Sequence, residues 1–154
     1  MHERLVLCGG AEYKGKRSKQ ALSLAILGSQ SNIKLRLDDI SRRMVTNVPD
    51  LLTDLVEIGT YVLLADEAVS RGGNARAALG SRWRRRFRFV IPVRSPDRWS
   101  SSEVADALTD VLAFLSDDEF HFEFKRCANP PPFQTYLGLA DGEPRFRGAQ
   151  RGRN

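Results

Sequence analysis

The sequence predicts a two-layer α+β domain in which a mixed sheet of about five strands carries two main helices on one face. Short segments near both ends of the chain alternate apolar and polar residues, which is the period of a half-buried strand. Two longer segments, residues 47–70 and 100–115, repeat their apolar residues at helical spacing. Strand, helix and strand follow one another over residues 84–125, which predicts a right-handed crossover between two parallel strands. The 154 residues, 42% of them hydrophobic, suit a single core.

The N-terminal part is expected to supply three strands. Residues 5–8 form a short apolar run that Gly9 and Gly10 close, as at the end of a strand. A second apolar run covers residues 21–27, and apolar and basic residues alternate over residues 33–37. The polar residues between these two runs predict a hairpin whose second strand is half-buried.

Residues 47–70 are expected to form the central helix. Asn47 is a suitable N-cap, and Pro49 suits the first turn of a helix. Apolar residues occur on most sides of the segment, which predicts that much of its surface is buried. Gly72 and Gly73 then provide a helix stop.

Residues 84–94 and 119–125 give the strongest strand signals. The apolar face of the first is formed by Phe87, Phe89, Ile91 and Val93. Arginines occupy most of its other face. Pro92 has no N–H to donate, so we expect the strand to end there or to lie at a sheet edge. The second segment buries three phenylalanines in the same alternating way.

Between these strands, residues 100–103 have the spacing of a helix capping box, Ser100 to Glu103. The helix that follows carries one apolar stripe, made by Val104, Ala107, Leu108, Val111, Leu112 and Leu115. We expect this stripe to be buried against the sheet. The single domain is expected to cover residues 1–127. Residues 128–154 are expected to be a proline-containing connector and a flexible tail rich in arginine and glycine.

The composition excludes several classes of protein. No apolar run approaches the roughly 18 residues of a membrane span, and the N-terminus lacks the apolar region of a signal peptide. We therefore expect a cytoplasmic protein with no membrane partner. Cys8 and Cys127 are too few for a disulfide framework or a four-ligand zinc site. The motifs of phosphate-binding loops, dinucleotide sites and catalytic triads are missing from the sequence, so we expect no catalytic residue, metal or cofactor in this chain.

The net charge of +5 is the remainder of large blocks of opposite sign. Residues 49–70 contain five acidic residues and no Lys or Arg, and residues 99–124 contain seven acidic residues and no Lys or Arg. Between them, residues 71–98 contain nine arginines against one aspartate. Such blocks can pair within one fold, so the basic balance is weak evidence for an acidic partner.

The densest basic segment covers residues 82–88 and contains two aromatic residues. Arginines that hold phosphates beside rings that stack on bases are typical of nucleic-acid-binding proteins. The same arginines can instead pair with Glu119 and Glu123 if the two strands are neighbours. Both interpretations remain open at this point. The candidate residues for binding a partner or an anion are Arg84, Arg86, Arg88, Arg94 and Arg71.

A second candidate site is polar and consists of His121, Glu123 and Asp66. A histidine beside carboxylates can pass a proton or bind a metal, but a metal site normally needs three or four ligands. A structural role across neighbouring strands explains the pattern equally simply. Cys8 offers a similar choice between a nucleophile next to glycines and a core cysteine, and its apolar strand favours the core.

Four segments carry a resemblance to a known family. They are VPDLL at residues 48–52, ADEAVSRGG at residues 65–73, RFRFVIPVRSPDRW at residues 86–99 and FLSDDEFHFEF at residues 114–124. Read together, they resemble the N-terminal module of the 7-cyano-7-deazaguanine synthase-like (QueC-like) proteins of bacterial antiphage defence systems. The similarity covers roughly residues 47–125.

The resemblance implies that the module precedes an ATP-dependent PP-loop domain, whose Ser-Gly-Gly-x-Asp-Ser loop binds ATP and whose four cysteines hold zinc. Neither motif occurs in this sequence, since Cys8-Gly9-Gly10 is followed by Ala11-Glu12-Tyr13. ATP, zinc and the ligase- or synthase-like chemistry would then belong to a partner chain or to a C-terminal part that is missing from this sequence.

The resemblance therefore predicts a non-catalytic accessory module. It would dock on a QueC-like catalytic domain or another defence-system protein, or deliver a protein substrate to it. The alternative is a small basic protein that binds nucleic acid through the Arg82–Arg88 row and the C-terminal tail. A small enzyme that uses His121 and Glu123 is a third, weaker hypothesis.

Overall fold

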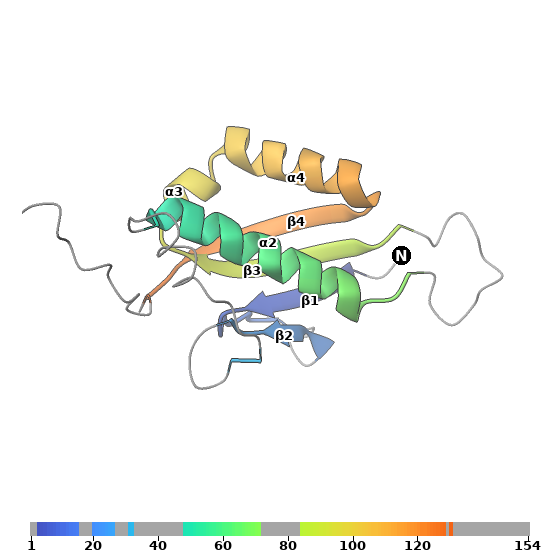
Figure 1. The fold of residues 1–154 in the computed structure, drawn as a ribbon. Helices are drawn as coiled ribbons and strands as arrows, with labels where there is room; N and C mark the ends of the chain where they lie inside the picture. Colours follow the sequence, from blue (N-terminus) through green and yellow to red (C-terminus); the bar gives the residue numbers. More distant parts are fainter. Residues whose placement is uncertain are drawn as a thin grey trace, which may run out of the picture.

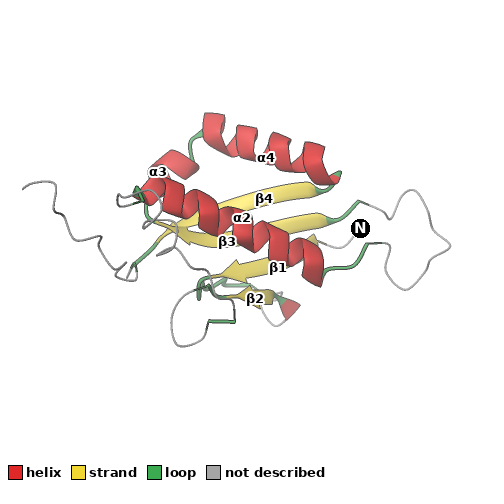
Figure 2. Ribbon diagram, viewed as in Figure 1, coloured by secondary structure: helices red, strands yellow, loops and turns green. Residues whose placement is uncertain are grey.

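The computed structural model describes residues 3–15, 20–26, 31–32, 48–71, 84–128 and 130. Its strands are β1 (Glu3–Cys8), β2 (Leu22–Leu24), β3 (Arg86–Val93) and β4 (Glu119–Arg126) (Figure 1). Its helices are α2 (Asp50–Ala68), the short α3 (Pro96–Trp99) and α4 (Ser102–Ser116) (Figure 2). The fold is α+β, as the sequence predicts. None of the helices in these ranges is long and apolar enough to cross a membrane.

The four strands form one sheet in the order β2-β1-β3-β4, and every neighbouring pair is parallel. The predicted strand–helix–strand unit is present, with β3 and β4 parallel and directly adjacent and α4 between them in the chain. We expect about five strands in a mixed sheet; over the described residues the sheet has four strands and is wholly parallel. The strand predicted over residues 21–27 is present as β2, which pairs parallel with β1. The strand predicted over residues 33–37 lies outside the described residues.

Gly9 and Gly10 turn the chain at the end of β1. Their φ angles are +56° and +76°, in the left-handed region that glycine enters without a steric penalty. A Cβ on Gly9 would lie 2.8 Å from the Cγ of Pro92, so this turn packs directly on the end of β3. The sequence prediction of a turn here is confirmed.

Pro92 lies in a strand that has neighbours on both sides, although we expected it to end the strand or to lie at an edge. The pairing of β1 with β3 stops at Leu7 and Val90, whereas β4 pairs with β3 as far as Val93. The backbone groups of successive β3 residues point alternately to β4 and to β1. Those of Arg85 and Val93 point to β4, because their carbonyls accept from the N–H groups of Glu119 and Cys127. By the same alternation, the missing N–H of Pro92 faces the β1 side beyond the last paired residue, so no ladder bond is lost.

One hydrophobic cluster joins the same side of the strands to the helices. Its buried members from the sheet are Val6, Cys8, Leu24, Phe87, Phe89, Ile91 and Val93. α2 contributes Ile58, Tyr61 and Ala65, and α3 contributes Trp99. The predicted buried face of β3 is confirmed, whereas the phenylalanines of β4 pack against the cluster but are only partly buried. Phe89 stacks on Phe122 with ring centroids 5.4 Å apart.

α4 packs more loosely than its sequence predicts. Val104 and Leu108 contact the cluster, but no residue of α4 is fully buried. Val111 and Leu115, which we expected on the buried stripe, are 56% and 72% exposed. The reason is geometric: Val104, Leu108 and Leu112 form the half-buried row that faces the sheet, whereas Ala107, Val111 and Leu115 form the neighbouring row, which faces solvent.

The helix caps also differ from the sequence expectations. α4 begins after Ser101, whose hydroxyl donates to the carbonyl of Arg98 rather than capping the new helix. α2 begins after Pro49, while Asn47 and the predicted Gly72-Gly73 stop lie outside the described residues. Asp117 ends α4 with a left-handed φ of +57°.

Candidate functional site

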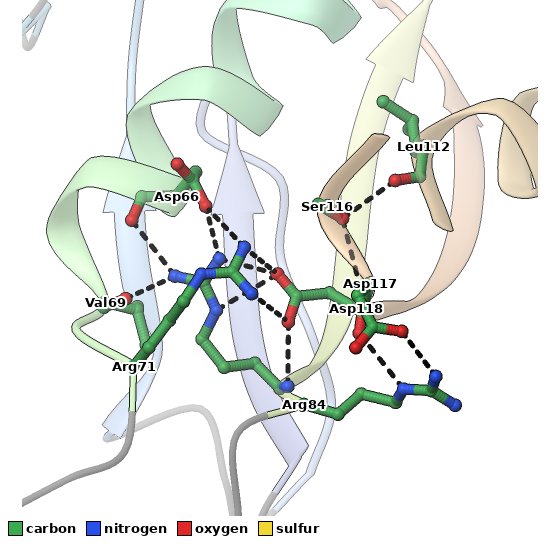
Figure 3. Close-up of polar contacts among 9 residues, drawn as sticks. Asp66, Val69, Arg71, Arg84, Leu112, Ser116, Asp117 and Asp118 are labelled. Atoms are coloured by element: carbon green, nitrogen blue, oxygen red, sulfur yellow. Dashed lines mark hydrogen bonds and ion pairs between the residues drawn. The ribbon is translucent and has the colours of Figure 1, made fainter. Parts of the chain in front are cut away.

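Buried arginine–carboxylate contacts lie at both ends of α2. At its C-terminal end, Arg85, Arg71, Asp66 and Asp118 form the first of these, which we call the β3-entry cluster. Asp118 is 2% exposed. Its carboxylate accepts one hydrogen bond from the backbone N of Arg85 at 2.8 Å and another from Nη2 of Arg85 at 2.6 Å. Arg71 reaches the same carboxylate through Nη2 at 3.0 Å. Figure 3 shows Asp66, Arg71 and Asp118 converging from α2 and the turn before β4.

Arg85 also closes the C-terminus of α2. Its Nη1 donates to the carbonyl of Asp66 at 3.1 Å and to that of Val69, and its Nη2 pairs with the Asp66 carboxylate. These are the last carbonyls of the helix, which lack partners within it. Arg71, which the sequence marks as a candidate for binding a partner or an anion, places its Nη2 3.0 Å from Oδ2 of Asp118 and 3.5 Å from Oδ1 of Asp66.

The charges of this cluster support one another. The hydrogen bond from Arg85 is the main cause that lowers the pKa of Asp66, with the nearby Arg71 charge adding to it. Burial by itself would lower the pKa of Arg85, but its bonds to Asp118 and Asp66 outweigh burial and raise it. Both groups therefore stay ionised over the ordinary pH range.

Beside the cluster, exposed Arg84 pairs with the carboxylate of Asp117 and donates from Nε to its carbonyl at 3.0 Å. A surface pocket adjoins this pair and is lined in part by Thr109, Ala113 and Phe120. The pocket's charged groups are thus already partnered within the chain.

The second set of contacts is at the N-terminal end of α2, and we call it the β3-exit cluster. Asp54 is fully buried, and its carboxylate accepts from the backbone N–H groups of Arg94 and Ser95 at 3.0 and 3.1 Å. The indole Nε1 of Trp99 donates to it at 3.1 Å. The guanidinium of Arg94 bridges Asp54 at 2.9 Å and Glu57 at 2.9 Å. These bonds raise the pKa of Arg94 against the opposing effect of burial.

The remaining candidate arginines lie on the other side of β3 and are also paired. Arg86 donates to Glu119 at 2.6 Å, as the neighbouring-strand interpretation predicts. Arg88 lies 3.2 Å from Glu3 of β1 instead of pairing with Glu123, which is 3.4 Å from Lys125. All five arginines proposed from sequence, Arg71 and Arg94 included, therefore contact a carboxylate of this chain.

The predicted polar site is not brought together. His121 is exposed opposite Arg88 in the sheet, and Glu123 follows it on the same side of β4. Asp66 lies on α2 in the β3-entry cluster, on the side of the sheet that the helices cover. Within the described ranges, no group of three or more His, Cys, Asp or Glu side chains is arranged to hold a metal ion.

Cys8 is a core residue, as its apolar strand predicts. It is fully buried in the hydrophobic cluster, and burial raises the pKa of its thiol well above the ordinary value. A thiol that stays protonated is a poor nucleophile, so the core interpretation of Cys8 is confirmed.

Sequence reasoning missed the roles of Asp54, Glu57, Arg85 and Asp118. A signal for the first two was present in the sequence. Glu57 follows Asp54 by three residues, and the core residues Ile58, Tyr61 and Ala65 follow it by four, seven and eleven. Residues at these spacings lie on one face of a helix. Carboxylates in phase with core residues indicate buried partners. Arg85 carried the same kind of signal, since within the predicted strand of residues 84–94 it alternates in phase with Phe87 and Phe89 and so falls on the buried face.

The helices also expose large apolar side chains. Phe114 is 89% exposed on α4, next to Val111 and Leu115. α2 exposes Leu51, Leu52, Leu55 and Leu63, at 37 to 59%. We call Val111, Phe114 and Leu115, which adjoin on α4, the helix apolar surface.

Comparison of the chain with family models, with curated proteins and with solved structures finds no match. A function has to be inferred from the residues of this chain.

Proposed function

We propose that this chain is a non-catalytic interaction module of a QueC-like antiphage defence protein. It docks on an ATP-dependent PP-loop domain, or delivers a protein substrate to it, and that domain is carried outside this chain. The support from the structure is the helix apolar surface, and above all Phe114. The support for the particular family is the sequence resemblance over residues 47–125.

An exposed apolar surface of this kind favours protein binding. Single exposed apolar residues are ordinary, but Val111, Phe114 and Leu115 are spaced three and four apart and so adjoin on one helix. Aromatic side chains that lose their exposure on binding contribute much of the free energy of protein interfaces. A surface that presents a phenylalanine in this way gains most from a protein partner.

The candidate arginines give less support to the nucleic-acid alternative. Each one already contacts a carboxylate, so a phosphate would have to displace that carboxylate before it could bind. The acidic blocks of α2 and α4 would also repel a polyanion on the helix side.

The finer fold belongs to the same proposal. The helices form one layer over the sheet, and residues 33–37 add a fifth strand. The proposal of a single helix layer is supported by the one hydrophobic cluster that joins α2, α3 and α4 to one side of the strands. ATP and zinc are assigned to the PP-loop domain, in keeping with the family that the sequence resembles.

The test is a calorimetric titration of the full chain with a QueC-like catalytic domain from the same genome. We expect one-to-one binding that Phe114→Ser weakens, and ATP turnover only when the catalytic domain is present. No measurable association between the two would overturn the proposal. The neighbouring DNA gives an independent check, since an adjacent reading frame that encodes Ser-Gly-Gly-x-Asp-Ser is expected.

A further inference from the structure

The exposed side of α4 has two chemically different halves. Residues four apart along this helix lie in rows. One row consists of Glu103, Ala107, Val111 and Leu115. The neighbouring row consists of Asp106, Asp110 and Phe114. The first two turns of both rows are acidic or small, and the last turns are apolar. A partner must therefore match carboxylates at one end and bury Phe114 at the other.

α2 adds a second apolar row with a gap in it. Leu51, Leu55, Gly59 and Leu63 are four residues apart, and all four are exposed. A Cβ placed on Gly59 would meet no atom within 4 Å, so nothing in the described part of this chain requires glycine there. Glycine in a helix interior costs about 1 kcal/mol relative to alanine. A closely approaching backbone of another molecule would explain it.

The surroundings of both rows carry one sign of charge. Neither α2 nor α4 contains a Lys or Arg. The exposed carboxylates of Asp50, Glu67, Glu103, Asp106 and Asp110 form no ion pair within the described ranges of the chain. Arg71, Arg84, Arg85, Arg86, Arg88 and Arg94 contact other carboxylates.

From these observations we infer that the helix apolar surface binds a basic amphipathic helix of a partner protein. The apolar side of that helix covers Phe114 and its neighbours, and its Lys or Arg residues face Asp106 and Asp110. The inference deepens the proposed function and rests on it only in requiring a protein partner. Recognition of an amphipathic helix by an apolar surface with opposite flanking charge is a recurring mode of peptide binding.

The charge also decides between this occupant and the others. A second copy of the chain, related by a twofold axis, would bring acidic α4 against acidic α4, which opposes association. Nucleic acid and anionic lipid would be repelled for the same reason. A basic helix is the occupant whose charge and shape both fit.

The inference can be tested with a defined probe. The probe is a fluorescent Leu/Lys peptide of about 18 residues, long enough for several helical turns, with its leucines on one helical face. One control peptide has the same composition in scrambled order, and a second has Glu in place of Lys. Binding to the full chain is measured by fluorescence anisotropy at about 50 mM and about 300 mM NaCl, because screening weakens contacts between exposed charges.

We expect the amphipathic basic peptide to bind about tenfold more tightly than either control peptide, and more weakly at the higher salt. Phe114→Ser should weaken its binding about tenfold. Asp106→Asn with Asp110→Asn should remove most of the salt dependence. Glu12→Gln is the matched control, because Glu12 is an exposed carboxylate in the loop after β1, and it should change nothing.

Phe114→Ser also separates binding from folding. The side chain is 89% exposed, so its replacement should leave the free energy of unfolding almost unchanged while peptide binding falls. Equal binding of the ordered and scrambled peptides would overturn the inference, as would wild-type binding by Phe114→Ser. A dimer of the full chain, detected by light scattering and abolished by Phe114→Ser, would also overturn the inference. A second copy of the chain would then be the occupant of the surface.

The outcomes also distinguish this inference from the proposed function. If the QueC-like domain fails to bind but the peptide results hold, the family assignment is wrong and the docking surface stands. If the domain binds equally to wild type and to Phe114→Ser, it docks elsewhere, and the surface described here is not its site.

Discussion

Arg85 donates hydrogen bonds to Asp118 from its backbone N, Nε and Nη2, and the two residues stand side by side immediately before β3 and β4. Glu119 returns a bond from its N–H to the carbonyl of Arg85 at 2.8 Å. The first rung between the two strands is therefore fixed by a buried ion pair as well as by the backbone. Because Arg85 also closes the end of α2, one side chain aligns a helix and two strands.

Replacing Asp118 is expected to destabilise the fold strongly. Asp118→Ala leaves the buried guanidinium of Arg85 without its main acceptor, and such a loss costs about 3 to 5 kcal/mol. Urea unfolding followed by circular dichroism measures the change. The double variant Arg85→Met with Asp118→Leu should recover a substantial part of it, because both charges are then removed together. A single variant as stable as wild type would show that the pair does not align the strands.

Asp54 is expected to be nearly as sensitive. Asp54→Ala removes the acceptor of the Trp99 indole and of two backbone N–H groups, at a cost of about 2 to 4 kcal/mol. Asp50→Asn, an exposed carboxylate on the same helix, should change the free energy of unfolding by less than about 0.5 kcal/mol. Tryptophan fluorescence adds a local readout of the Trp99 contact. Equal stability of the two variants would contradict the role given to Asp54.

The outer arginines are expected to matter little. A triple variant combines Arg84→Gln, Arg86→Gln and Arg88→Gln. The ion pairs that it loses are exposed or partly exposed to solvent, and such ion pairs contribute little to stability. The urea midpoint should move slightly, and any binding of a DNA or RNA oligonucleotide should be unchanged. Salt-sensitive binding that disappears in the triple variant would instead support the nucleic-acid alternative.

The two cysteines are expected to react at very different rates. Burial raises the pKa of the Cys8 thiol, whereas Cys127 is only partly buried. At neutral pH, iodoacetamide should therefore modify Cys127 first and Cys8 only after denaturant is added. Mass spectrometry of tryptic peptides follows each site separately. Rapid modification of Cys8 in the folded chain would reopen the nucleophile interpretation.

Asp66 is expected to contribute to stability only above acidic pH. Its pKa is lowered in the folded chain, so its stabilising effect is complete above the ordinary value of about 4. The effect is lost as the pH falls through the lower folded-state pKa. Because the side chain is 49% exposed, the contribution is small. The stability difference between wild type and Asp66→Asn should be constant near neutral pH and shrink below about pH 4.

The sequence was most informative where a regular pattern coincides with burial. Phe87, Phe89 and the phenylalanines of β4 were placed correctly because alternation alone assigns a strand residue to one side. Pairing and direction depend on contacts between distant segments, so the parallel alignment of β1 with β2 could not be read from residues 5–27.

The candidate sites were harder to predict, because charge does not reveal its partner. Arg85 and Arg86 are neighbours of identical type, yet one is buried under α2 and the other is exposed on β3. The two residues are consecutive, so their side chains lie on opposite faces of the sheet, and the helices cover the face of Arg85. On α4, helical spacing marks a wide apolar stripe, but only the row of Val104, Leu108 and Leu112 is half-buried, while Ala107, Val111 and Leu115 are exposed.

The position of β1 has a consequence for how the chain is made. β1 leaves the ribosome about eighty residues before β3, yet residues 3–7 pair with residues 86–90 and lie between β2 and β3. Until β3 has been synthesised, β2 is the one neighbour that the described residues give this apolar strand, and it pairs over three residues. Nascent chains that stop before β3 should therefore be the ones that chaperones hold and proteases cut, whereas β3, α4 and β4 are contiguous and can assemble as soon as they emerge.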